Sequence, residues 1–212
     1  MSIHGGIPPS VIKRMTKYLA YVQRLRQDKT RWVSSSELAA KLGLTSSTVR
    51  QDLSHIDFSG TSKRGYDVHG LERVLTHVLG ADIRWSMVVV GAGNLGRALV
   101  LHEDFGRRGF NIVGIFDADR RKAGSTVGAL SVQPMKELPA VVKARDARIG
   151  IIAVPEEGAQ SVADQLVACG VKGLLNLALT HVSVPRNTAV VEARIAASLL
   201  ELSYLVKSTT AT

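Results

Sequence analysis

Cysteine is nearly absent from this chain, whose 212 residues include a single one, Cys169. One cysteine excludes an internal disulfide and a zinc site built from cysteines, so we expect a protein of a reducing compartment. No uninterrupted apolar run reaches the roughly 18 residues of a membrane-spanning helix, and no charged and then apolar leader opens the sequence. These absences predict a cytoplasmic protein without a membrane partner.

Groups of residues suited to catalysis or metal binding are also missing. The six histidines are scattered along the chain, and no set of histidine, aspartate and glutamate has the spacing of metal ligands. Tyr204 and Lys207 are too close together for the Tyr-x-x-x-Lys pair of short-chain dehydrogenases. The sequence therefore predicts neither catalytic residues nor a metal site.

Positive charge, by contrast, is in excess and is concentrated in the first part of the chain. Residues 1–80 contain twelve Lys and Arg against six Asp and Glu, whereas residues 81–212 contain fifteen against twelve. A basic first domain is typical of proteins that bind nucleic acid, although charge that serves only solubility is also common.

The stretch from Val88 to Leu99 predicts a strand, a tight turn and a helix. Three glycines in it have the G-x-G-x-x-G spacing of a dinucleotide-binding turn, in which the N–H groups that open the helix face phosphates. A plain strand-to-helix turn is the alternative that this spacing alone leaves open. The residues predicted to bind a dinucleotide here are Gly91, Ala92, Gly93, Asn94, Leu95 and Gly96.

Asp117 strengthens the dinucleotide interpretation. It ends a second predicted strand, residues 111–116, and follows Gly96 by roughly the 20 residues that lead to a ribose-binding acid. A carboxylate here favours NADH and NAD⁺ over their 2′-phosphorylated forms, although the cations at residues 120–122 offer that phosphate a partner. The alternative is a solvated loop aspartate or a helix cap.

Two further apolar runs, residues 149–154 and 173–177, predict buried parallel strands joined by a helix. Pro155 and Asn176 lie at the carboxyl ends of these strands, which is the edge where ligands bind in such sheets. We therefore add both to the predicted cofactor site, with a role in shaping loops as the alternative.

The first eighty residues predict a helix-turn-helix. A capping box of Ser34 and Glu37 opens a short helix that stops at Gly43, and Thr45 caps a second one that reaches about residue 56. The second helix of this arrangement enters the major groove of DNA, where arginine reads guanine and glutamine reads adenine. A solvated helix face is the alternative. The predicted DNA contacts on this helix are Ser46, Ser47, Arg50, Gln51 and Ser54.

Residues 57–68 predict a β-hairpin beside that helix. Gly60 and Gly65 bracket two adjacent cations, Lys63 and Arg64. Such a wing brings cations to phosphates or into a minor groove, so we predict that both contact DNA; an ordinary exposed turn is the alternative.

The whole pattern predicts an α/β protein. Residues 1–80 form a winged-helix (helix-turn-helix) DNA-binding domain, and residues 84–194 form a Rossmann dinucleotide-binding domain. Residues 195–212 form a C-terminal dimerisation helix and tail. Because this last helix is apolar almost all round, we expect it to be buried against a partner subunit.

Several short motifs, taken in order and spacing, resemble those of the Rex redox-sensing transcriptional repressors of bacteria. The resemblance implies a homodimer that exchanges its C-terminal helices, binds operator DNA of inverted-repeat sequence and releases it when NADH binds. The motifs are Ile7-Pro8 leading into Arg14, Thr48–Ser54, Gly91–Gly96, Phe116–Asp119, Val154-Pro155 and Gly173–Asn176.

The sequence departs at three places from the residues that are usual in this family. Gln51 replaces a lysine that many members have, His102 replaces a tyrosine near the nicotinamide, and Arg194-Ile195 replaces an Asp-Phe pair. In the family that aspartate exchanges partners between the tyrosine and an arginine matching Arg14. The resemblance thus makes Arg14, His102 and Arg194 the switch candidates, and cations beside the nicotinamide would favour NADH over NAD⁺.

The alternative function is an NAD-dependent oxidoreductase with a basic N-terminal appendage. The absence of a catalytic constellation favours the repressor, which has no need of one. The predicted cofactors are the same under both hypotheses, namely NADH and NAD⁺.

Overall fold

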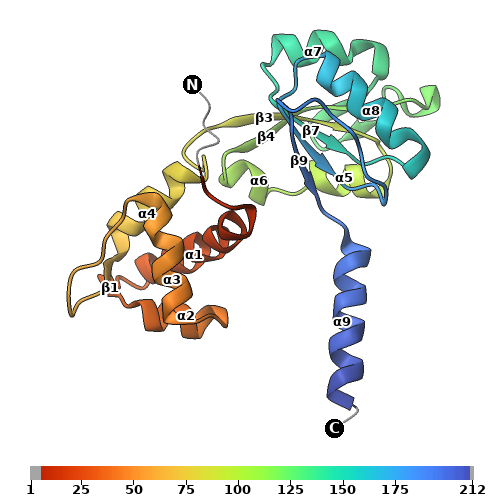
Figure 1. Ribbon diagram of the computed structural model, residues 1–212. Helices are drawn as coiled ribbons and strands as arrows, with labels where there is room; N and C mark the ends of the chain where they lie inside the picture. The colour runs from red at the N-terminus through yellow and green to blue at the C-terminus, as the bar shows by residue number, and fades with distance from the viewer. Residues whose placement is uncertain (1–5, 211–212) are drawn as a thin grey trace. The chain divides into compact units, whose positions relative to one another are not determined.

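The chain divides into two compact units, Met1–Ile83 and Arg84–Thr212. The computed structural model describes residues 6–210; its first unit is mainly helical and its second is built on a parallel sheet (Figure 1). The predicted α/β class is confirmed. None of the helices between residues 6 and 210 has the length and hydropathy that crossing a membrane requires.

The first unit packs its helices around one apolar core. Tyr18, Val49 and Leu71 are among the buried residues, and they bring α1, α3 and α4 together. The predicted capping box is present, because Ser34 and Glu37 each accept a hydrogen bond from the other's backbone N–H. The elements are α1 (Pro9–Gln27), β1 (Trp32–Val33), α2 (Ser35–Leu42), α3 (Ser46–Leu53), η1 (Ser54–Ile56), β2 (Tyr66–Asp67) and α4 (Val68–Val78).

The segment after α3 differs only in part from the sequence prediction. α3 ends at Leu53, and the chain continues as the 3₁₀ turn η1. The predicted hairpin tip is present, because Thr61 and Gly65 form an isolated antiparallel bridge. The strand that follows it, β2, pairs antiparallel with β1, with Trp32 opposite Asp67. The partner strand lies far earlier in the chain, so local turn signals could not identify it. The wing therefore consists of the pair of β1 and β2 together with the turn at residues 61–65.

The second unit contains, within its described residues, a seven-stranded sheet with the order β5-β6-β4-β3-β7-β8-β9. All neighbouring strands are parallel except β5 and β6. The elements are β3 (Trp85–Val90), α5 (Asn94–Val100), α6 (Asp104–Arg107), β4 (Phe110–Asp117), η2 (Arg120–Lys122), β5 (Thr126–Val127), β6 (Leu130–Pro134), η3 (Met135–Glu137), α7 (Leu138–Ala144), β7 (Ile149–Ile152), α8 (Glu156–Ala168), β8 (Gly173–Asn176), β9 (Ala189–Glu192) and α9 (Ile195–Thr210).

The strand order places a ligand crevice beside β3. β4 lies on one side of β3 and β7 on the other, so successive crossovers run in opposite directions from this strand. Alternate residues of β3 face opposite sides: Val88 and Val90 pack in the core that α7 and α8 cover, and Met87 and Val89 in the core on the α5 side. In such sheets ligands bind outside the carboxyl ends of the strands where the order reverses.

The terminal helix α9 is exposed in this single chain. Its large apolar side chains are more than half accessible, Leu200 to 73%. We expected this segment to be buried against a partner subunit because of its apolar character, and the chain alone leaves it exposed. An exposed apolar helix of sixteen residues is typical of a surface that binds another protein chain.

Candidate functional site

The glycine motif forms the turn between β3 and α5. Gly91 has a φ of 110°, and a Cβ placed on it would collide with the carbonyl of Ala153. A Cβ on Gly96 would collide with the carbonyl of Gly91, so α5 can pack this closely on the turn only with glycine there. A Cβ on Gly93 would meet no atom within 4 Å. The turn is thus closed towards the sheet and open at its middle glycine.

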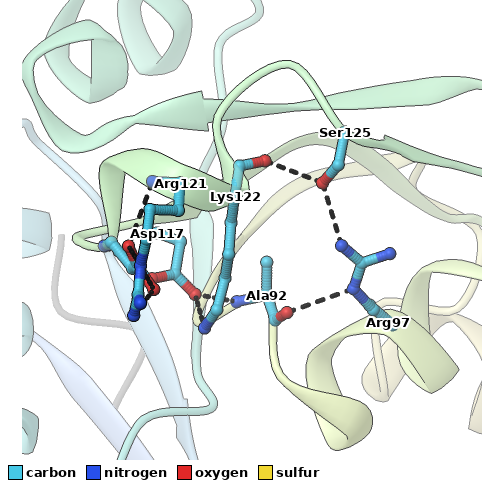
Figure 2. Close-up of polar contacts among 7 residues, drawn as sticks. Ala92, Arg97, Asp117, Arg121, Lys122 and Ser125 are labelled. Atoms are coloured by element: carbon cyan, nitrogen blue, oxygen red, sulfur yellow. Dashed lines mark hydrogen bonds and ion pairs between the residues drawn. The ribbon is translucent and has the colours of Figure 1, made fainter.

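Asp117, at the end of β4, faces this turn (Figure 2). Its Oδ2 accepts hydrogen bonds of 2.8 Å from the backbone N–H of Ala92 and from the Lys122 ammonium, and its Oδ1 accepts one from the N–H of Asp119. Burial acts to raise the pKa of Asp117, but the donors, led by Lys122, outweigh burial and hold the pKa below its usual value. The carboxyl group is therefore ionised at neutral pH and remains an acceptor.

A cavity of about 430 Å³ opens between the turn, the residues that follow β7, and α8. Among the predicted site residues, the structure brings Gly91, Gly93, Asp117 and Pro155 together around it. Asn94 and Leu95 open α5 beside it with exposed side chains. The other lining residues are Val90, Ala118, Lys122, Met135, Ala153, Val154, Gly158, Ser161, Val162 and Gln165.

Asn176 is not among the residues that line this cavity. Its side chain is fully buried, its Nδ2 donates to the carbonyl of Thr180 and its Oδ1 accepts from the N–H of Ala178. Both ends of the amide are thus engaged in the loop after β8. The contacts match the alternative that we gave for this residue, that of shaping a loop.

The helix-turn-helix surface is present in the first unit. α2 ends at Gly43, which has a left-handed φ of 65°, and α3 begins after the Thr45 cap. Ser47, Arg50, Gln51 and Ser54 are exposed and Ser46 is half-buried. Arg50 donates a 3.2 Å hydrogen bond to Ser35 at the start of α2, so its guanidinium lies over the junction of the two helices.

Asp52 anchors α3 from its inner face. It is 2% exposed, accepts two 2.6 Å hydrogen bonds from the Arg14 guanidinium and accepts a third, also of 2.6 Å, from the Tyr18 hydroxyl. Burial acts to raise the pKa of Asp52, but Arg14 and Tyr18 bring it below its ordinary value. The guanidinium of the switch candidate Arg14 is therefore engaged inside the first unit.

The wing carries exposed cations around one aromatic ring. Arg31 and Arg64 each lie 5.8 Å from the centre of the Trp32 ring, a distance typical of cation–π contacts. Lys63 has a left-handed φ of 63° at the tip. Gly65 could not be replaced, because a Cβ there would collide with the carbonyl of Val33.

The two switch candidates of the second unit are not among the residues that line the cavity. His102 is exposed and its ring stacks on Phe105 at 4.8 Å. Arg194 forms a 2.6 Å ion pair with Glu192, which also lies 2.7 Å from the Nδ1 of His181. The charge of Arg194 is thus compensated by a carboxylate at the end of β9.

Comparisons with known proteins support the same two-part organisation. Residues 6–54 match the family described as a putative DNA-binding protein N-terminus, and residues 82–180 match the CoA binding domain family. The redox-sensing transcriptional repressor Rex of Desulforamulus reducens is 41% identical over 184 residues, which cover 87% of this chain and 88% of that protein.

Solved structures agree over nearly the full length. RSP, a Rex-family repressor, was crystallised with β-NAD⁺ and operator DNA; that structure has a TM-score of 0.91 at 32% identity and covers 97% of this chain and 94% of RSP. RSP with β-NADH gives a TM-score of 0.87 at 32% identity, with 99% and 97% covered.

A helix-turn-helix unit joined to a Rossmann-like unit defines a class of DNA-binding regulators that carry a nucleotide-binding domain. Within this class, the chain belongs to the Rex family of redox-sensing transcriptional repressors. The resemblance inferred from the sequence motifs is confirmed, and the relatives are named as repressors rather than as enzymes.

Proposed function

We propose that this protein is a transcriptional repressor that senses the NADH/NAD⁺ ratio and releases operator DNA when NADH binds. The observation that carries the proposal is the cavity in which an open glycine turn meets the ionised carboxylate of Asp117. An open turn accommodates a diphosphate, and an ionised acid accepts hydrogen bonds from ribose hydroxyls. RSP, which binds both NAD⁺ and NADH, supports this assignment.

The proposed cofactor site consists of the turn Gly91–Gly96 together with Asp117 and Pro155. We do not include Asn176, because its amide is engaged within its own loop. The ionisable side chains that line the cavity, Asp117 and Lys122, are paired with each other. This supports a site that binds a dinucleotide without acting on a substrate.

The proposed DNA-reading surface is the outer face of α3 together with the wing. Arg50 and Gln51 are exposed side by side there, and bidentate bonds from such residues read guanine and adenine. Lys63 and Arg64 supply charge for phosphates. The proposed domains are residues 1–80 for DNA, 84–194 for the nucleotide and 195–212 for dimerisation.

The exposed apolar helix α9 supports a homodimer. Its exposed apolar side chains, among them Leu199 and Tyr204, need a surface to cover them. A second copy of the chain is the natural partner, because operators of inverted-repeat sequence present two equivalent half-sites. Truncation after residue 194 is expected to give monomers in sedimentation experiments, and a stable dimer of the truncated chain would locate the interface elsewhere.

Mobility shift in the presence of nucleotides tests the proposal. An inverted-repeat duplex, selected by the protein from a randomised pool, is titrated with the full-length chain alone, with NAD⁺ and with NADH. We expect NADH to weaken the complex, and linkage then requires the operator to weaken NADH binding by the same factor. An operator affinity that is identical under all three conditions would refute redox sensing.

A further inference from the structure

Arg97, on α5, joins the glycine turn to the segment after β4 (Figure 2). Its Nε donates a 3.2 Å hydrogen bond to the carbonyl of Ala92, and its Nη2 donates a 2.9 Å bond to the hydroxyl of Ser125. The side chain is half-buried and is not among those that line the cavity. Arg97 thus lies behind the proposed nucleotide site and not in it.

The contacts continue from Ser125 back to the turn. The Ser125 hydroxyl donates to the carbonyl of Lys122 at 2.7 Å, and the Lys122 ammonium donates to Asp117 at 2.8 Å. Asp117 accepts from the N–H of Ala92, which completes a ring that begins and ends at one residue. Donors and acceptors balance, because Ser125 accepts from Arg97 while it gives its single proton to Lys122.

This ring ties the two halves of the proposed site together, in addition to the backbone hydrogen bond from Gly91 at the turn to Phe116 at the end of β4. Ala92 belongs to the turn that would take the diphosphate, and Asp117 is the acid that would take the ribose. The part of the ring between them passes through Lys122, Ser125 and Arg97. Without Arg97, the N–H of Ala92 still reaches Asp117, but the η2 segment loses its tie to α5.

We propose that Arg97 is a positioning residue of the nucleotide site, which sets the spacing between the glycine turn and Asp117. The inference rests on the proposed dinucleotide function and adds a residue whose side chain does not line the cavity. A site held at the correct spacing before binding loses less conformational entropy when the ligand arrives. Arg97 therefore strengthens binding of every ligand that carries both a diphosphate and its adenosine ribose.

The inference makes a distinctive prediction about which ligands are affected. Since the ring surrounds the adenosine end of the site, its loss should weaken NADH, NAD⁺ and ADP-ribose by the same factor. The ratio of NADH to NAD⁺ affinity should stay unchanged. A residue that acts on the nicotinamide would change that ratio and would leave ADP-ribose unaffected.

Calorimetry with the three ligands tests this on the full-length protein. Arg97→Met keeps an apolar stem and removes both donors, and we expect affinities on the order of tenfold weaker for all three ligands, as for loss of a charge-assisted hydrogen bond. The matched control is Arg107→Met, at an arginine of α6 that is 75% exposed and outside the ring. It should bind as the unmodified protein does.

Ser125→Ala provides an independent break in the same ring. It removes the hydroxyl that links Arg97 to Lys122 and leaves both cations in place, so it should weaken binding of the three ligands in parallel and leave the ratio of NADH to NAD⁺ affinity unchanged. Combining Arg97→Met with Asp117→Asn should cost less than the sum of the two single changes, because the ring acts through that carboxylate.

The outcomes separate the two proposals. If the unmodified protein binds none of the three ligands, the proposed function fails and this inference fails with it. If the unmodified protein binds them and both Arg97→Met and Ser125→Ala bind equally well, the inference alone is overturned. A change in the NADH to NAD⁺ ratio in Arg97→Met would also overturn it.

Discussion

In each unit a carboxylate accepts three hydrogen bonds, and these two carboxylates are arranged alike. Asp52 in the first unit and Asp117 in the second each have one oxygen with two donors and one with a single donor. In both, burial opposes ionisation and the donors prevail, so both pKa values lie below the ordinary range. Their surroundings differ: the Asp52 side chain is 2% exposed and that of Asp117, at 11%, borders a cavity.

The difference shows how the same electrostatic arrangement serves two purposes. The donors of Asp52 are side chains of another helix, Arg14 and Tyr18, so the carboxylate ties α1 to α3. Two donors of Asp117 are backbone N–H groups of the turn and of its own loop, so this carboxylate orders the rim of an opening. A carboxylate that is closed off from solvent, such as Asp52, stabilises the fold. An open carboxylate that borders a cavity, such as Asp117, is available to a ligand.

Breaking the closed cluster, which consists of Asp52, Arg14 and Tyr18, should have the largest effect on the free energy of unfolding. Arg14→Met leaves the buried charge of Asp52 with Tyr18 alone, and such losses cost about 3–5 kcal/mol of unfolding free energy. Because the Arg14 side chain is 28% exposed, we expect the lower end of this range. Urea unfolding of the first unit measures the effect, and nucleotide binding by the second unit should persist.

Arg26→Met is the matched control for this change. Arg26 lies on the same helix and pairs with Glu72, but its side chain is 57% exposed, so its loss should cost at most about 1 kcal/mol. Equal costs for the two variants would mean that the cluster around Asp52 stabilises no more than a surface pair does.

A change at the open carboxylate, Asp117, should affect nucleotide binding more than stability. Asp117→Asn keeps the shape of the side chain and weakens its charge-assisted bonds to ribose, which are worth about 1.5–3 kcal/mol. We expect NADH affinity, measured by calorimetry, to fall by that amount while thermal stability changes little. The control Asp119→Asn keeps the backbone N–H that donates to Asp117, so it should bind NADH normally. If Asp117→Asn also bound NADH normally, Asp117 would not be the acid that binds the ribose.

The sequence predicted those features whose signals lie close together in the chain. The spacing of the glycines and Asp117, and the capping box of Ser34 and Glu37, follow from local geometry that any chain with these residues shares. Rossmann and helix-turn-helix units could therefore be inferred before any contact was known.

Contacts between distant segments could not be inferred in that way. Arg14 and Asp52 are 38 residues apart, and nothing in their spacing marks them as partners. The pairing of β1 with β2 was missed for the same reason. Arg97 gave no signal either, since a surface arginine and one that closes a ring look alike in sequence. The signal for Asn176, the end of a strand, fitted a ligand contact and a loop equally well.

Acid should weaken the closed cluster in a predictable direction. Because the pKa of Asp52 is lower in the folded chain, the unfolded chain binds the extra proton first as the pH falls. The stabilisation is fully present above about pH 4, the ordinary range of an aspartate, and is lost below it. The difference in free energy of unfolding between the unmodified protein and Asp52→Asn should therefore become smaller from about pH 6 to about pH 3. Urea unfolding at each pH measures it, and a difference that does not change with pH would contradict the ion pair.

The smallest effect should come from cations held by an aromatic ring instead of a carboxylate. Trp32 lies under Arg31 and Arg64, and exposed cation–π contacts contribute about 0.5–1 kcal/mol. Trp32→Leu keeps an apolar residue in β1 but frees Arg64, so operator binding should weaken by that amount in fluorescence anisotropy, with Trp32→Phe in between. If the ring acts by holding Arg64 ready for DNA, Arg64→Met should add little to Trp32→Leu. Fully additive losses would show that Trp32 and Arg64 contribute separately to operator binding. The wing would then differ from the two carboxylate clusters, in which the role of each cation depends on its partner.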